Sequence, residues 1–273
     1  MSARRHFWGG GSPLFLRIRI IHVTKIRVEV YPASRRDDRL RRRGIMSVAV
    51  GLGDMRMMLL CADRQMTDAQ AGLKFEGRKV RGYASTGLEK PHNIAFAYCG
   101  NPEIADTLFD SLIEGVSSAM EDASDCDVFE AEYFRQCLLP VFRSKDAKGM
   151  MTLIALQTAH RCFLFKTKAD QVVIGDRECI GGGDSSVLRY IADMASRTEM
   201  HSVETALPFA IYLVSLANRY VDGCGFGVDA VILQDGKPIT FVGKEQTGKY
   251  SKRFAQFERK MEKQFFMEQL NES

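Results

Sequence analysis

Three polar residues that could act together lie at equal intervals near the start of an apolar segment. Ser47, Asp63 and Lys79 are separated by 16 residues each. In an antiparallel hairpin, the residue numbers of two paired positions add up to a constant, and half of that sum marks the turn. Pairing Ser47 with Asp63, and Asp63 with Lys79, therefore places both chain reversals next to a glycine. The spacing therefore predicts that the three side chains meet at one edge of a sheet.

These three residue types are the ones that an N-terminal nucleophile needs. A serine hydroxyl is a weak nucleophile at its ordinary pKa and requires a neighbouring base. If Ser47 begins the mature chain, its own α-amine, which titrates at about 7.7–8.0, can take the hydroxyl proton. Lys79 would hold that amine neutral, and Asp63 would keep Lys79 charged and oriented. Taken singly, Asp63 is a common turn residue and Lys79 a common surface cation, so the prediction rests on the spacing.

The first 46 residues differ in composition from the rest. They hold twelve Arg and Lys against three acidic residues, a net charge of +9, so residues 47–273 carry −5. Three interpretations remain: a removable pro-segment, translated upstream sequence with Met46 as the initiator, or a basic arm that stays attached. Methionine before a small serine is a good aminopeptidase substrate, so initiation at Met46 would expose the amine of Ser47 without self-cleavage.

Composition excludes several classes of protein. No window of 18 uncharged apolar residues exists, so we expect no spanning helix and no membrane partner. The acidic body argues against nucleic-acid binding. Seven cysteines without a C-x-x-C pair and five histidines without ligand spacing predict no metal site and no cofactor. They instead indicate buried thiols in a reducing, cytoplasmic compartment.

The apolar patterns predict strands, two helices, strands, two helices and a final hairpin. Gly100 ends one strand, and Asn101 followed by Pro102 is typical of a helix start. Such blocks favour an α+β layered fold in one domain, residues 47–249. Beyond it, an amphipathic C-terminal helix is expected over residues 250–273, with an apolar stripe of Tyr250, Phe254, Phe257, Met261, Phe265 and Leu270.

Three segments, Ser47–Gly51, Leu60–Thr67 and Arg78–Val80, resemble the opening of proteasome β-type subunits. These are N-terminal nucleophile hydrolases (threonine proteases) with a four-layer αββα sandwich, and the resemblance covers most of residues 47–242. It implies that Ser47, Asp63 and Lys79 are catalytic. It also implies that Asp222 supports the nucleophile, that the backbone of Thr67 pairs with substrate, and that the Gly100 amide forms the oxyanion hole.

The sequence departs from this family pattern at several positions. Serine stands where the family has threonine, and Met46 stands where it has glycine. Gly181–Asp184 resembles the family's Gly-Ser-Gly-Ser stretch, but Gly182 and Gly225 replace supporting serines. The stretch between Lys79 and Gly100 is longer than usual, which leaves Lys90 as a second candidate for the lysine role.

The leading hypothesis is a proteasome-like peptidase or amidohydrolase that acts on peptide or unfolded protein substrates through Ser47. The alternatives are a catalytically silent structural subunit of a ring assembly and a binding protein with a coincidental Ser-Asp-Lys spacing. An apolar stripe left in water would favour aggregation. We therefore expect a homo-oligomeric ring in which the C-terminal helix contributes a subunit contact, with an unfoldase as a possible partner.

Overall fold

The computed structural model describes residues 47–68, 73–85, 91–122, 131–144, 147, 149–168, 170–181, 202–221 and 223–271. Several predictions lie outside these residues: the basic extension, the first helix of the second predicted pair, Lys90, Gly182 and Asp222. Residues Ile45–Ser273 form one compact unit.

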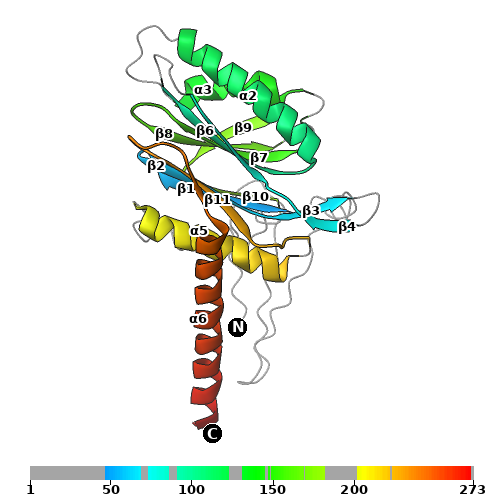
Figure 1. Ribbon diagram of the computed structural model, residues 1–273, viewed down its shortest axis with the longest axis vertical. Coiled ribbons are helices and arrows are strands. Elements are labelled where there is room, and N and C mark those ends of the chain that lie inside the picture. The colour runs from blue at the N-terminus through cyan, green and yellow to red at the C-terminus, as the bar shows by residue number, and fades with distance from the viewer. Residues whose placement is uncertain are drawn as a thin grey trace, which may run out of the picture. The chain divides into compact units, whose positions relative to one another are not determined.

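The described strands form three antiparallel sheets (Figure 1). The first sheet has the order β10 (Arg177–Gly181), β1 (Val48–Asp54), β2 (Met57–Asp63), β11 (Val228–Gln234) and β12 (Thr240–Val242). The second has the order β5 (Val80–Ala84), β6 (Asn93–Cys99), β7 (Met151–Gln157), β8 (Cys162–Lys168) and β9 (Gln171–Gly175). A separate ribbon pairs β3 (Gln65–Asp68) with β4 (Leu73–Glu76).

Four helices complete the described fold: α2 (Pro102–Asp122), α3 (Ala131–Phe142), α5 (Val203–Tyr220) and α6 (Lys244–Asn271). Helix α2 begins where the sequence predicts, because the Asn101 carboxamide oxygen accepts the N–H of Glu103 at 2.8 Å. Helix α6 begins six residues before the expected tail, at Lys244. The described residues thus form a mixed α/β fold.

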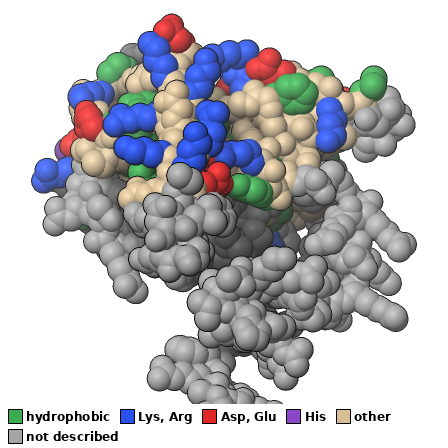
Figure 2. Space-filling view, turned by 90° about the horizontal axis from the view of Figure 1, so that it is seen from below, with side chains coloured by type: hydrophobic (Ala, Val, Ile, Leu, Met, Phe, Trp, Pro, Cys, Tyr) green, Lys and Arg blue, Asp and Glu red, His purple; other side chains and the backbone are tan. Residues whose placement is uncertain are grey.

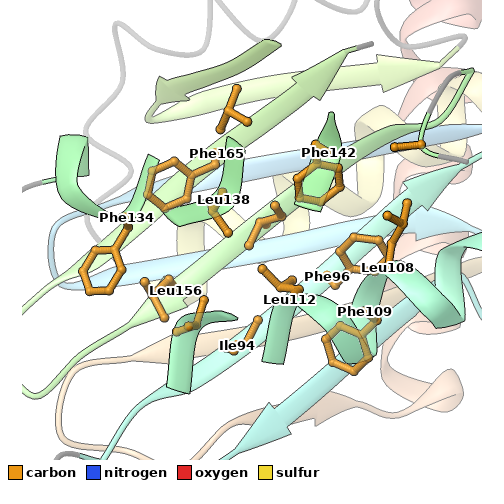
Figure 3. Packing of buried hydrophobic residues seen from close by; sticks show 14 of the residues in the cluster. Ile94, Phe96, Leu108, Phe109, Leu112, Phe134, Leu138, Phe142, Leu156 and Phe165 are labelled. Carbon is orange, nitrogen blue, oxygen red and sulfur yellow. The ribbon is translucent and has the colours of Figure 1, made fainter. Parts of the chain in front are cut away.

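Three hydrophobic clusters occupy three successive spaces in this unit. One lies between α5 and β1, β2 and β11 of the first sheet. The second contains side chains from both five-stranded sheets, such as Leu60 and Ala97, which therefore pack face to face. The third joins α2 and α3 to the second sheet through aromatic residues, including Phe96, Phe134 and Phe165 (Figure 3). Figure 1 shows the same order, with α2 and α3 above the sheets and α5 below.

The β1–β2 register differs by one residue from the expected pairing of Ser47 with Asp63. Ala49 pairs with Ala62, and Met55 and Arg56 form the turn. The glycine next to the turn does not set this register. The Asp54 carboxylate does so, because it accepts the N–H groups of both Arg56 and Met57.

The second expected reversal occurs in the separate ribbon, where Gln65 pairs with Glu76. After the ribbon the chain crosses into the other large sheet, since β5 begins at Val80. The expectation that Lys79 lies at the same sheet edge as Asp63 is therefore wrong. Lys79 enters the second sheet, and Asp63 ends a strand of the first.

Candidate active site

Ser47, Asp63 and Lys79 meet between the two large sheets. The Lys79 ammonium donates a hydrogen bond to Ser47 Oγ at 2.7 Å and another to Asp63 Oδ2 at 2.8 Å. The exposed fractions of Ser47, Lys79 and Asp63 are 8%, 2% and 0%. The lysine thus spans the gap between the sheets and holds the hydroxyl and the carboxylate at once.

Each of the three side chains sits at the end of a strand. Ser47 directly precedes β1, Asp63 is the last residue of β2, and Lys79 directly precedes β5. Antiparallel pairing brings the start of β1 to the end of β2, and the Lys79 carbonyl accepts the N–H of Tyr98 at 3.4 Å. The long lysine side chain then covers the distance between the layers.

The Asp63 carboxylate is fully partnered although it is buried. Its Oδ1 accepts the N–H of Val48 at 2.8 Å, and its Oδ2 accepts the N–H of Gln65 at 3.0 Å in addition to Lys79. Burial raises the pKa of Asp63, and Lys79 with these two backbone amides opposes that rise. The Val48 contact also fixes the chain one residue after Ser47.

Two buried cysteines, Cys99 and Cys224, lie near this pair. Burial raises the pKa of Cys99 well above its usual value and that of Cys224 to about 12. The charges of Asp63 and Lys79 also affect the pKa of both thiols, because the two cysteines lie close to this pair. Because the thiolate is the reactive form, these thiols stay protonated and inert near neutral pH.

Gly181 packs directly against the backbone of Ser47. It pairs with Val48 across β1 and β10 and has a φ of +68°. A Cβ at this position would lie 2.0 Å from the Ser47 carbonyl oxygen and 2.7 Å from Cys99 Sγ. Only glycine therefore allows this approach.

A second buried ion pair lies beside the first and was not predicted. Arg64, next to Asp63, donates to Asp229 Oδ1 at 2.6 Å and contacts Glu76 at 2.7 Å. Burial raises the pKa of Asp229, and the Arg64 guanidinium and the backbone N–H of Lys79 oppose the rise. Asp229 thus holds Arg64, the residue that follows Asp63. The one sequence feature that could have indicated this ion pair is the Asp229 carboxylate inside the apolar run of β11.

The remaining predicted residues are placed separately. Thr67 is exposed in β3. It pairs with Lys74 of β4, and no other described strand pairs with it. Gly100 follows Cys99 at the end of β6 with a φ of +142°. Gly225 accepts the N–H of Arg64 through its carbonyl. Lys79 is a lysine whose ammonium contacts Ser47, whereas Lys90 lies outside the described residues.

Neither a metal cluster nor a spanning helix occurs in the described part of the chain. No group of three His, Cys, Asp or Glu side chains is arranged there to hold a metal ion. None of the four helices in that part has both the length and the apolar character that crossing a membrane requires.

Solved structures with a similar fold include two of Anbu from Hyphomicrobium sp. strain MC1. A mutant of Anbu aligns with a TM-score of 0.61 at 14% sequence identity, over 79% of this chain and 96% of that chain. A second Anbu structure aligns with a TM-score of 0.58 at 14% identity, over 78% and 96%. The match shows the fold. At this identity it shows nothing about activity.

The expected membership in the proteasome β-type subunit family is wrong. No protein-family model matches the sequence, no curated protein matches it, and the similar solved structures include those of Anbu. The physical reason is that the segments that carried the resemblance build the first strands and their turns. Such segments indicate a shared way of folding rather than membership in one family.

Replacing Gly181 with alanine should destabilise the protein strongly, because the new Cβ would overlap the Ser47 carbonyl. Gly236→Ala is a matched control, since Gly236 has nearly the same φ, +67°, but open space around the Cβ position. The control should cost about 1–2 kcal/mol for its left-handed backbone, and Gly181→Ala clearly more. Thermal unfolding measures both; equal losses would contradict the close approach.

Lys79→Met should lower the free energy of unfolding by about 3–5 kcal/mol, because it leaves the buried Asp63 charge unpaired. Adding Asp63→Asn should recover part of that loss, since the double variant has no buried charge at this point. Urea denaturation of the wild type, both single variants and the double variant gives the coupling energy. Additive effects would show that the two side chains do not interact as described.

Proposed function

We propose that the chain is an N-terminal nucleophile hydrolase that cleaves peptide bonds through Ser47. The observation that carries the proposal is the Lys79 ammonium shared between Ser47 Oγ and the buried Asp63. The layered packing of helices on two sheets fits the αββα sandwich of such enzymes, and the fold similarity to Anbu supports it.

The reaction requires that Ser47 begins the chain. Its free α-amine then takes the Oγ proton while Oγ attacks the substrate carbonyl carbon, and the carbonyl electrons move onto oxygen. Collapse of the tetrahedral intermediate breaks the C–N bond, and the leaving amine receives the proton from the α-ammonium. Water attacks the resulting ester with the same amine as base, which releases the acid and restores Ser47.

Lys79 supports these steps by charge rather than by proton transfer. Its donation to Ser47 Oγ stabilises the developing negative charge on that oxygen and disfavours protonation of a neighbouring amine. Asp63 keeps this cation in place. The proposal assigns Asp222 to supporting the nucleophile and the N–H of Gly100 to holding the carbonyl oxygen.

The ribbon gives an extended substrate a place to bind. Strand β3 has β4 as its neighbour on one side, and Thr67 is exposed on it. An extended peptide can add to a strand edge through backbone hydrogen bonds, whatever its side chains. The proposal therefore places the peptide along β3, with Thr67 among the residues that pair with it.

Ser47→Ala should lower the rate of peptide hydrolysis by roughly 10⁴-fold or more, with the fold intact. Ser47→Thr, which keeps the hydroxyl, should remain active. Ser85→Ala is a matched control, because Ser85 is also buried but lies at the end of β5 opposite to Lys79. Turnover of fluorogenic peptides measures all three. Full activity in Ser47→Ala would reject the assignment, and an inactive wild type with a free Ser47 amine would favour the silent structural subunit.

Removal of residues 1–46 should switch the activity on, because an amide nitrogen cannot act as a base. A chain that starts at Met46 should be active after methionine removal, whereas the unprocessed chain should be inactive. In the active form kcat/KM should rise with pH as the α-amine loses its proton, with an apparent pKa at or below about 8. Intact mass and the pH profile test this; equal activity in a demonstrably unprocessed chain would contradict it.

A further inference from the structure

Helix α6 continues well beyond the residues that attach it to its own domain. Three of its residues contact α5. Ser251 Oγ lies 2.9 Å from Ser215 Oγ, and the ring centroids of Phe254 and Tyr212 are 4.9 Å apart. Glu258 forms an ion pair with Arg219. The helix then extends about 20 Å further to Asn271. Figure 1 shows α6 projecting beyond α5.

This outer part carries an apolar anchor flanked by cations. Phe257 and Met261 are 58% and 51% exposed. Arg253 and Lys260, four residues before and three residues after Phe257, lie on the same side of the helix. Residues 244–264 hold seven cations against three acids. Figure 2, seen from the side on which α6 extends, shows more Lys and Arg than acidic side chains.

The opposite outer layer has the complementary character. Helix α2 presents an acidic stripe to solvent, at helical spacing, made of Glu103, Asp106, Asp110, Glu114 and Glu121. Beside this stripe, a groove of about 450 Å³ lies between α2 and α3, with Ile104, Thr107, Pro140 and Val141 in its lining. An exposed groove with apolar walls and an acidic border fits a basic helix with an aromatic anchor.

Charge spacing and net charge both favour a second copy of this chain as the occupant. Residues 47–243 carry a net charge of −7, whereas residues 244–264 carry +4. Glu103 and Asp110 are seven residues apart, as are Arg253 and Lys260, so both pairs are separated by about 10.5 Å along their helices. The matching distances allow two ion pairs to form around one inserted side chain.

We propose that α6 of one copy docks along the α2–α3 groove of a second copy, with Phe257 in the groove and Arg253 and Lys260 on the acidic stripe. The two surfaces belong to opposite outer layers of the unit, so the contact is head-to-tail. Such a contact closes into a ring or continues as a stack. The proposal goes beyond the hydrolase function and does not depend on the chemistry of Ser47.

Charge reversal with a matched control tests the contact in the full chain. In sedimentation velocity at low salt, Arg253→Glu with Lys260→Glu should weaken assembly by at least tenfold in concentration. Lys252→Glu with Lys263→Glu changes the net charge by the same amount, but on the side of α6 away from Phe257. This control should leave assembly unchanged. Circular dichroism confirms that both variants fold.

The complementary variant, Glu103→Lys with Asp110→Lys, should also fail to assemble alone. Mixed with Arg253→Glu/Lys260→Glu, it should assemble again, because each variant then offers the surface that the other needs. A monomeric wild type, equal loss in the Lys252/Lys263 control, or a mixture that stays monomeric would each overturn the proposal. Undiminished assembly of Arg253→Glu/Lys260→Glu would also overturn it and would point to another basic segment.

Discussion

The buried Lys79 ammonium, shared between Ser47 and Asp63, is the interaction on which the rest of this structure depends. A lysine that is 2% exposed is stable as a cation only if its charge is matched and its hydrogen bonds are made. The Asp63 carboxylate supplies the charge, and the amides of Val48 and Gln65 hold that carboxylate in turn. The start of β1, the end of β2 and the entry to β5 must therefore stay in one arrangement.

The surrounding residues make this arrangement rigid. Gly181 lets β10 approach the Ser47 carbonyl, and Asp229, on a strand far along the sequence, holds Arg64. Glu76 extends the network to α6, because it also pairs with Lys244 at 2.8 Å. A site built on strand ends, with a second buried ion pair beside it, holds its side chains in place better than a site on loops.

The sequence predicts the meeting of Ser47, Asp63 and Lys79 because the β1–β2 hairpin and the β3–β4 ribbon each reverse the chain locally. It does not predict the register, since the Asp54 side chain sets the first turn. Nor does it predict that Lys79 crosses to the other sheet, because an apolar run does not say which sheet it joins. The Arg64–Asp229 pair joins residues 165 positions apart, and no spacing rule connects such residues.

Trapping the acyl-enzyme is the most direct test of whether Ser47 is the nucleophile. The chain that begins at Ser47 is incubated with an activated peptide ester, digested with trypsin and analysed by mass spectrometry. The account predicts one acyl group on the peptide Ser47–Arg56, released by hydroxylamine as an ester on Oγ and absent in Ser47→Ala. An acyl group on another residue, or none on a chain shown to have a free Ser47 amine, would contradict it.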